Sequence, residues 1–411
     1  MPESDLPIII IGAGISGLSL AQYLRREKIP YHVFERDPSI DARPGGWGLT
    51  LHYGLPALEE LLPPELYSRL NETNVNIEAV NDPGRYLFFD LKNGEAKYSL
   101  DFPKTGRLRV LRTKLRKLLT TGLDITWSKK LVEVRENPDS VTAIFEDGTT
   151  CEGRLIVGCD GSASRVRKYV YPTTYENQTV PVHFVGATVR YTPEQIRPAL
   201  ALDPYFFQGT HPETNVYLYF SVLNTPRNIG NDTDYYVAQA VVTWSYDKNI
   251  EIPENDAETV ALIKQLTSNW ASPFRELIEA IPEDAEIRRI HISDWYPTTS
   301  REHERVVVMG DAAHSMTMFR GEGGNNAVVD AHDFAKRVGH LLKQKDVPFE
   351  KIAAALRQYD EDILVRGRVS VINSRRACLD AHDYANLTDQ SPLVARRVRA
   401  DCNGTNGTNG N

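Results

Sequence analysis

Residues 7–17 read Pro-Ile-Ile-Ile-Ile-Gly-Ala-Gly-Ile-Ser-Gly, an apolar run that ends in closely spaced glycines. The run has the length of one buried strand, and residues 18–27 behind the glycines have apolar positions at helical spacing. Residues 31–35, Tyr-His-Val-Phe-Glu, predict a second buried strand. A strand, a glycine turn, a helix and a second strand form a unit of the kind that binds dinucleotides. We therefore predict an α/β fold that begins with a Rossmann-like unit.

The three glycines of this turn have distinct expected tasks. Gly12 permits the tight turn, Gly14 lets the backbone approach a pyrophosphate, and Gly17 lets the helix pack closely on the strand. The positive end of the helix attracts the anion. Glu35 ends the second strand, where its carboxylate can accept both hydroxyls of an adenosine ribose. The alternative is a turn that binds no ligand.

Two further motifs follow apolar strands. The segment 159–167 reads Cys-Asp-Gly-Ser-Ala-Ser-Arg-Val-Arg, in which Asp160 and Ser164 can also serve simply as caps of a helix. The segment 309–331 begins Met-Gly-Asp-Ala-Ala-His, and its glycine-rich loop leads to a helix that begins near Asn325. Backbone amides of such a loop can surround a polar group. Together the three motifs predict one extended cofactor site.

The remaining chain divides into a sheet-rich part and a helical part. β-Branched and aromatic residues recur in strands at 182–190, 215–223 and 235–246, and residues 109–119 and 349–385 have helical spacing. The net charge of −8 argues against a nucleic-acid partner. No apolar run is long enough to span a membrane, so a cytoplasmic location is expected. The spacing of the four cysteines predicts neither a metal site nor a disulfide framework.

On these three motifs the chain resembles the class A FAD-dependent monooxygenases, the para-hydroxybenzoate hydroxylase-like family. Segments 320–326 and 366–375 are similar to fungal members associated with specialised metabolism. The resemblance implies a glutathione-reductase-like FAD-binding lobe with a mixed sheet and helices, interleaved with a β-sheet substrate lobe and followed by C-terminal helices. The predicted boundaries are 1–75, 104–180 and 293–345 for the FAD-binding domain, 76–103 and 181–292 for the substrate domain, 346–395 for the C-terminal helices, and 396–411 for a disordered tail.

The resemblance also implies roles for individual residues at the cofactor. Besides the fingerprint glycines and Glu35, the implied FAD contacts are Arg36, Gly46, Gly48, Arg112, Asp160, Asp311, Gly323, Gly324 and Asn325. Asp160 is implied in NAD(P)H binding as well. The chain departs from the family at Met318, where members usually have a proline four residues after the His of Gly-Asp-Ala-Ala-His. A proline would fix the backbone and withhold an N–H group, so we expect a reshaped pocket near Met318.

The implied activity is oxygen insertion into an organic substrate. The resemblance implies that NADH or NADPH transiently reduces the flavin, that O2 forms a C4a-hydroperoxide, and that an aromatic or polycyclic secondary metabolite is hydroxylated or epoxidised. An FAD-dependent oxidase or dehydrogenase without oxygen insertion, and a degenerate flavin-binding protein, are the alternatives. No metal is implied, and a monomer or a homodimer is expected.

The substrate is expected to meet the sheet of the second lobe. Tyr217 and Tyr219 share one face of a strand, and Trp244 lies on a neighbouring strand with Tyr246. Such rings can clamp a planar molecule, although ordinary sheet packing is the alternative for each. Arg190 is the candidate for a polar substrate anchor with a catalytic role, and Met318 is a further candidate contact.

Overall fold

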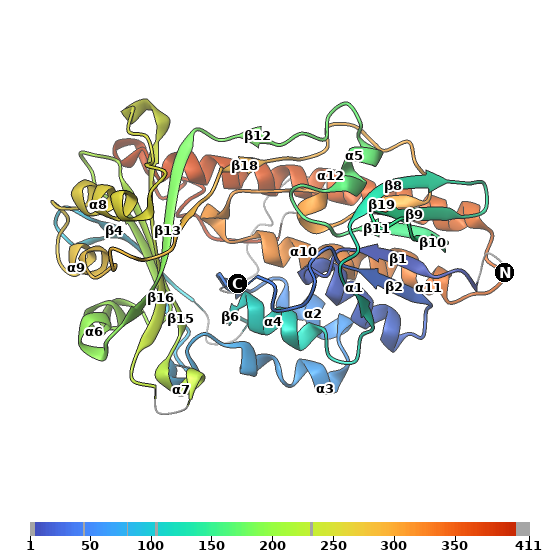
Figure 1. Cartoon of the computed structure of the whole chain (residues 1–411), viewed down its shortest axis with the longest axis horizontal. Coiled ribbons are helices and arrows are strands. Elements are labelled where there is room, and N and C mark those ends of the chain that lie inside the picture. The colour runs from blue at the N-terminus through green and yellow to red at the C-terminus, as the bar shows by residue number, and fades with distance from the viewer. Residues whose placement is uncertain (1–4, 44–45, 80, 103–105, 231–232, 400–411) are drawn as a thin grey trace.

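The computed structural model describes residues 5–43, 46–79, 81–102, 106–230 and 233–399. Two lobes lie side by side along the long axis of the molecule, and one long helix runs along both (Figure 1). None of the helices in the described ranges combines the length and the hydropathy that a membrane span requires.

The first lobe is built on a five-stranded parallel sheet. Its strand order is β19 (Val306–Val308), β11 (Leu155–Gly158), β1 (Ile8–Ile11), β2 (Tyr31–Phe34) and β7 (Ile125–Thr126). β1 lies between β11 and β2, with Ile9 paired to Ile156 and to His32. Both faces of the central strands are covered, which explains why their sequences are continuous apolar runs rather than alternating patterns.

Helices and short ribbons complete this lobe. α1 and α10 pack against each other close to the ends of the parallel strands. The helices are α1 (Ile15–Arg26), α2 (Leu55–Leu61), α3 (Pro64–Tyr67), α4 (Arg112–Leu119), α5 (Arg165–Val170), α10 (Gly323–Phe334) and α11 (His340–Leu342). The ribbons are β3 (Gly48–Leu51) with β6 (Leu108–Leu111), β8 (Leu131–Glu136) with β9 (Val141–Phe145) and β10 (Thr150–Gly153), and β12 (Gln178–Thr179) with β18 (Ser293–Asp294).

The predicted helix over residues 109–119 is wrong in its first turn. Leu108–Leu111 form strand β6, which pairs with β3 in antiparallel register, and α4 begins only at Arg112. Leu111 fits both the helical spacing and the strand. Hydrogen bonding to a distant strand, which local spacing does not reveal, decides the outcome.

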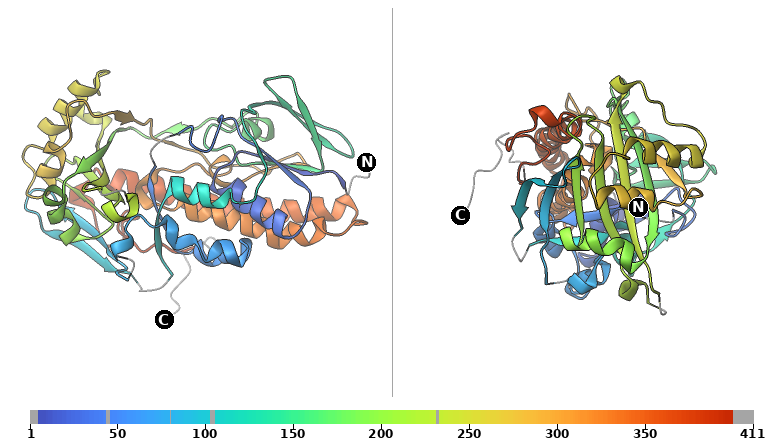
Figure 2. Two further views of the ribbon diagram at one scale, coloured as in Figure 1. Left: turned by 60° about the horizontal axis from the view of Figure 1, so that its bottom comes forward. Right: turned by 90° about the vertical axis from the view of Figure 1, so that its left-hand side faces the viewer.

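The second lobe is a seven-stranded sheet assembled from two separated parts of the chain. Its order is β17 (Ile287–Arg289), β13 (Val182–Tyr191), β16 (Tyr236–Ser245), β15 (Tyr217–Asn224), β14 (Phe206–Thr210), β4 (Arg85–Asp90) and β5 (Ala96–Asp101). Helices α6 (Pro193–Leu202), α8 (Asp256–Leu266) and α9 (Phe274–Glu279) cover the outer face, and α7 (Pro226–Ile229) follows β15 (Figures 1 and 2). The other face looks toward the first lobe.

One long helix, α12 (Phe349–Asp380), occupies most of the segment for which the sequence predicted C-terminal helices. Ile352, Leu356 and Tyr359 belong to the core of the first lobe, whereas Ala377 and Cys378 belong to the cluster on the inner face of the second. α12 therefore fixes one lobe relative to the other.

Candidate active site

A cavity of about 950 Å³ lies between the two lobes. The first lobe contributes the beginnings of α1 and α10, including Gly14 and Gly323, to its wall. The second lobe contributes aromatic side chains of its inner face, including Phe206 and Tyr219. The cavity thus joins the predicted cofactor motifs to the predicted substrate sheet without an intervening wall.

The glycine turn is closely packed at two positions and open at the third. A Cβ atom on Gly12 would lie 2.3 Å from the Cys159 carbonyl oxygen, and the φ angle of Gly12 is +107°. A Cβ atom on Gly17 would lie 2.2 Å from the Gly12 carbonyl oxygen. A Cβ atom on Gly14 would meet nothing closer than 3.8 Å, and Gly14 faces the cavity. Gly12 and Gly17 are therefore required by the fold, whereas Gly14 keeps space open for a ligand.

Two helices direct uncapped N-termini at the cavity. Neither the Gly14 cap of α1 nor the Glu322 cap of α10 contributes a side-chain hydrogen bond to its helix. Ile15 and Ser16 of α1 and Gly324 of α10 line the cavity. Free N–H groups at the positive ends of two helices are suited to phosphate and to other electron-rich oxygens.

Arg112 and Asp311 are the charged residues of this part of the cavity. Burial and the neighbouring Arg116 lower the pKa of the Arg112 guanidinium. Burial raises the pKa of the Asp311 carboxyl, and His314 and Arg112 partly offset this rise. A guanidinium beside two helix N-termini can bind a pyrophosphate, and a carboxylate next to it can accept hydrogen bonds from ribityl hydroxyls. These residues fit FAD by the chemistry of their donors and acceptors.

Glu35 braces the glycine turn. Its Oε2 accepts a hydrogen bond of 2.7 Å from the Ala13 amide, and its Oε1 accepts one of 3.1 Å from the Asp37 amide. Each carboxylate oxygen has a further lone pair free for a ribose hydroxyl. Arg36 is exposed and has no described contact that would bring it to the cavity.

Arg116 supports the same turn and was not singled out from the sequence. It is buried, and its Nε donates a hydrogen bond of 3.1 Å to the Ala13 carbonyl. Because Arg116 lies four residues after Arg112 on α4, the two guanidiniums point to the same side of the helix. That spacing was the available signal.

The side chain of Asn325 links the start of α10 to residues 50–54 of the first lobe. Its Oδ1 accepts from the amides of His52 (2.9 Å) and Gly54 (3.1 Å), and its Nδ2 donates to the Thr50 carbonyl (2.8 Å). Asn325 is fully buried and does not line the cavity, in contrast to Gly323 and Gly324.

Asp160 caps α5, as the simpler interpretation proposed. Its carboxylate accepts hydrogen bonds from the Ser164 hydroxyl and, at 2.6 Å, from the Arg165 amide. Burial raises the pKa of Asp160 despite these bonds. Its neighbours Cys159 and Gly161 line the cavity, but Asp160 does not.

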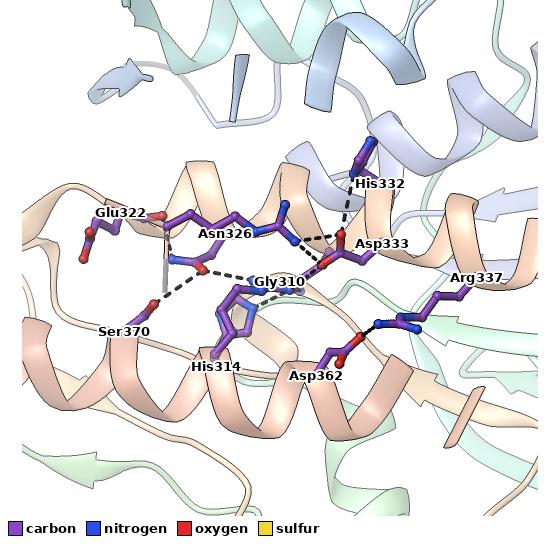
Figure 3. A network of polar contacts seen from close by, with 12 residues as sticks. Gly310, His314, Glu322, Asn326, His332, Asp333, Arg337, Asp362 and Ser370 are labelled. Carbon is purple, nitrogen blue, oxygen red and sulfur yellow. Dashed lines mark hydrogen bonds and ion pairs between the residues drawn. The ribbon is translucent and has the colours of Figure 1, made fainter. Parts of the chain in front are cut away.

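A buried ionic network holds the Gly310–Asp311 turn in place. Oδ2 of Asp330 accepts from the Gly310 amide and from His314 Nε2, both at 2.7 Å, and Oδ1 accepts from Arg366 Nη2 at 2.6 Å. Gly310 and His314 lie side by side in it (Figure 3). Burial alone would raise the pKa of Asp330, but His314 and Arg366 hold it well below its usual range. These contacts give His314 a structural role, and neither Asp330 nor Arg366 was singled out from the sequence.

The aromatic residues predicted to contact the substrate lie on opposite faces of the second sheet. Tyr217 and Tyr219 both line the cavity. They pair with Thr243 and Val241 of β16, so Trp244 points to the opposite face and is buried beneath the outer helices. Tyr246 lies beyond the end of β16, in a 3₁₀ turn. Trp244 is therefore a core residue and not a substrate contact.

Of the remaining predicted residues, Met318 and Gly48 line the cavity and Gly46 does not. Met318 lines the cavity and is 42% exposed, at the start of a 3₁₀ turn. Gly48 lines the cavity, and a Cβ atom there would lie 2.5 Å from Arg109 Nη2. Gly46 is buried against Leu111 and Thr113.

The structure does not bring Arg190 to the cavity. Arg190 shares a strand face with Phe184, which lines the cavity, but six residues of strand separate them by about 20 Å. Arg190 is exposed, and its guanidinium lies 4.9 Å from the centre of the Tyr235 ring. The strand face was chosen correctly, but the distance along the strand makes the proposed anchoring role wrong.

Replacing Arg190 with alanine is expected to leave kcat/KM within about twofold of the wild-type value, because an exposed residue remote from the cavity contributes little to either binding or folding. Steady-state turnover of any accepted substrate measures this. A decrease in kcat/KM of tenfold or more would show that Arg190 does contribute to substrate binding or catalysis.

The first residues of the predicted tail are ordered against the cavity. Arg396, Arg397, Val398 and Arg399 all line it. Arg397 Nη2 donates to the Leu393 carbonyl at 2.7 Å, and Arg399 forms an ion pair with Asp333 at 3.0 Å. The predicted start of the tail at residue 396 is thus too early, since Arg399 pairs with Asp333 of α10 in the first lobe. Residues 400–411 lie outside the described residues.

Comparisons with known proteins identify the family of the chain. The family model described as FAD binding domain matches residues 5–348. An FAD-dependent monooxygenase of Emericella nidulans, dbaB, is 39% identical over 387 residues, covering 89% of this chain and 98% of the relative. An FAD-dependent monooxygenase of Talaromyces islandicus, cctM, is 31% identical over 402 residues, covering 97% and 98%. The structure of Klebsiella pneumoniae HpxO with FAD and uric acid superimposes with a TM-score of 0.73 at 22% identity, covering 92% and 90%.

The chain therefore belongs to the FAD binding domain family. Its relatives over nearly the whole length make it, more narrowly, an FAD-dependent monooxygenase. The resemblance inferred from the motifs, the α/β fold class and the FAD cofactor are confirmed.

Proposed function

We propose that this monooxygenase uses NADH or NADPH and O2 to insert one oxygen atom into a planar aromatic or polycyclic substrate, by hydroxylation or epoxidation. The observation that supports this most is the single cavity that runs from the uncapped ends of α1 and α10 to the aromatic inner face of the second sheet. A cofactor and an organic substrate placed there would share one enclosed space.

In this proposal Gly14, Arg112 and Asp311 hold the FAD pyrophosphate and ribityl chain, and Gly323 and Gly324 meet the flavin ring through the start of α10. Glu35 binds the adenosine ribose. Bound FAD supplies electron transfer to O2 and activation of the oxygen that is inserted. The protein supplies orientation and exclusion of water.

The substrate side of the cavity is aromatic. Phe184, Phe206, Tyr217 and Tyr219 line it from three neighbouring regions of the sheet. Aromatic rings are suited to hold a flat molecule by offset or edge-to-face contacts. The proposed substrate class follows from this lining.

His52 would act there as a neutral group. It lines the cavity, and burial together with Arg397, Arg107 and Arg320 lowers the pKa of its imidazole to about 3. It therefore remains uncharged at neutral pH and can either donate or accept one hydrogen bond without a change of charge.

The decisive experiment uses purified, FAD-loaded protein and ¹⁸O-labelled dioxygen. NADH and NADPH oxidation is followed with a panel of phenolic and polycyclic compounds, and the products are weighed by mass spectrometry. Stimulation of NAD(P)H oxidation by one compound, with gain of one labelled oxygen atom, is the expected result. Oxidation of the substrate without label would support the oxidase or dehydrogenase alternative instead.

A further inference from the structure

Arg109 is a buried cation in the wall of the cavity, at the boundary of the two lobes. It leaves strand β6 and is 5% exposed. Its Nη1 donates to Thr50 Oγ1 at 2.8 Å, and its Nη2 donates to the Tyr219 hydroxyl at 2.6 Å and to Ser221 Oγ at 2.8 Å. The side chain therefore reaches from the first lobe to the sheet of the second.

The partners of Arg109 are all neutral. In the described ranges Arg109 forms no ion pair with a carboxylate, and its buried Nε has no hydrogen-bond acceptor. Burying a positive charge without a counter-ion is costly, because hydroxyl groups do not replace the lost hydration fully. A bound anion would offset that cost.

Arg107 adds a second guanidinium at the same wall. One of its Nη groups donates to the Pro83 carbonyl, while no acceptor for its buried Nε and Nη2 lies among the residues that the structure describes. Both guanidiniums lie near the Phe206 ring, at 5.3 Å for Arg107 and 4.8 Å for Arg109. Burial lowers the pKa of Arg107 to about 10, so it is still charged at neutral pH.

Tyr219 offers a further donor. Because its oxygen accepts the hydrogen bond from Arg109, its own hydroxyl hydrogen must be donated elsewhere, and no acceptor for it lies among the described residues. Tyr219 faces the cavity. The guanidinium groups of Arg107 and Arg109 and the hydroxyl of Tyr219 thus present hydrogen-bond donors to the same region of the cavity, and the described residues leave several of these donors without an acceptor.

Positively charged side chains also outnumber negatively charged ones in the rest of the cavity wall. The lining carboxylates among the described residues are Asp101 and Asp311. The lining arginines are Arg107, Arg109, Arg112, Arg320, Arg396, Arg397 and Arg399. Arg320 and Arg399 are already paired, with Glu322 and Asp333 respectively, and Arg112 belongs to the proposed FAD site. Arg397 donates to the backbone carbonyls of Leu393 and Ala395, and Arg396 is exposed to solvent. Arg107 and Arg109 are therefore the lining arginines that we assign to the substrate.

We infer that Arg109 and Arg107, with the Tyr219 hydroxyl, form an anion-binding subsite that holds a carboxylate or phenolate oxygen of the aromatic substrate. This inference deepens the proposed function and rests on it, because it defines which aromatic compounds bind. The enzyme would select acidic aromatic compounds over their neutral analogues. The glycine at position 48 is part of the subsite, since any Cβ atom there would displace the Arg109 guanidinium.

The test measures binding rather than turnover. FAD-loaded protein is titrated with 1-hydroxy-2-naphthoate and with 1-hydroxy-2-naphthamide, and the absorbance change of the bound flavin gives each Kd. The wild type is expected to bind the acid about 10- to 100-fold more tightly than the amide, as a charge-assisted hydrogen bond predicts. Arg109→Gln is expected to bring this ratio close to one without loss of FAD, and Arg109→Lys to keep part of it.

Arg197→Gln, on the exposed surface of α6, is the matched control and should retain the full ratio. Tyr219→Phe keeps the charge and should lower the affinity for the acid several-fold, which provides a second test if Arg109→Gln does not fold. An equal affinity for both compounds in the wild type, no binding of either, or an unchanged ratio in both Arg109→Gln and Tyr219→Phe would overturn the inference. Acid-selective binding without incorporation of labelled oxygen would instead contradict the proposed function and leave the subsite intact.

Discussion

Asp330→Asn is expected to lower the free energy of unfolding by about 3–5 kcal/mol, the range for removing one partner of a buried ionic group. The neutral amide would leave Arg366 buried without its main counter-charge, next to His314, and would weaken the hydrogen bond from the Gly310 amide. FAD affinity should fall as well, because this amide positions the turn that carries Asp311. Thermal unfolding followed by circular dichroism, together with the flavin content after purification, measures both effects.

A surface ion pair provides the control for this substitution. Glu304 pairs with Arg357, and both side chains are 57% exposed. Glu304→Gln is expected to change the free energy of unfolding by less than about 1 kcal/mol. If Asp330→Asn were no more destabilising than Glu304→Gln, the buried network would not be what holds the Gly310–Asp311 turn.

Gly17→Ala and Gly14→Ala are expected to separate folding from cofactor binding. The new Cβ atom at position 17 would lie 2.2 Å from a backbone oxygen, so α1 must move away from β1 at a cost of about 1–3 kcal/mol or more. We expect this variant to be unstable and colourless. The Cβ atom at position 14 has room within the protein but would project toward the ligand. Gly14→Ala should therefore fold normally and bind FAD about tenfold or more less tightly.

The two variants are compared by circular dichroism of the apoprotein and by titration with FAD. Gly148→Ala serves as a control for the general effect of replacing a glycine, because its Cβ atom would meet nothing within 4 Å in the turn between β9 and β10, although its positive φ adds local strain. Unchanged FAD affinity in a well-folded Gly14→Ala protein would contradict the assignment of this turn to the pyrophosphate.

The sequence predicted those parts of the site that depend on local geometry. The glycine spacing of residues 12–17, the carboxylate of Glu35 and the polar groups that follow β11 and β19 are readable because each is fixed by a short segment. Strand alternation likewise placed Tyr217 and Tyr219 on one face. The same alternation excludes Trp244 once its pairing with His183 of β13 is known.

Features that depend on distant parts of the chain could not be predicted in this way. Arg109 touches Tyr219 only because β6 pairs with β3 at the boundary of the lobes, and no local pattern reports that position. Asp330 follows the apolar residues 327–329 in α10, and its partner Arg366 lies 36 residues away on α12. A charged residue directly after a short apolar run was the signal in the sequence, and this signal does not identify the partner.

The continuity of α12 limits how this enzyme can open. A hinge between lobes requires a few backbone positions that change conformation, yet here a helix of 32 residues is buried at one end in the first lobe and at the other in the second. Along it, Gly367 leaves no space beside His314, since a Cβ atom there would lie 3.0 Å from that side chain. Closure of one lobe on the other, as in hinged enzymes, would require α12 to bend or break. We therefore expect substrate and reductant to enter through movements at the rim of the cavity rather than through closure of one lobe on the other.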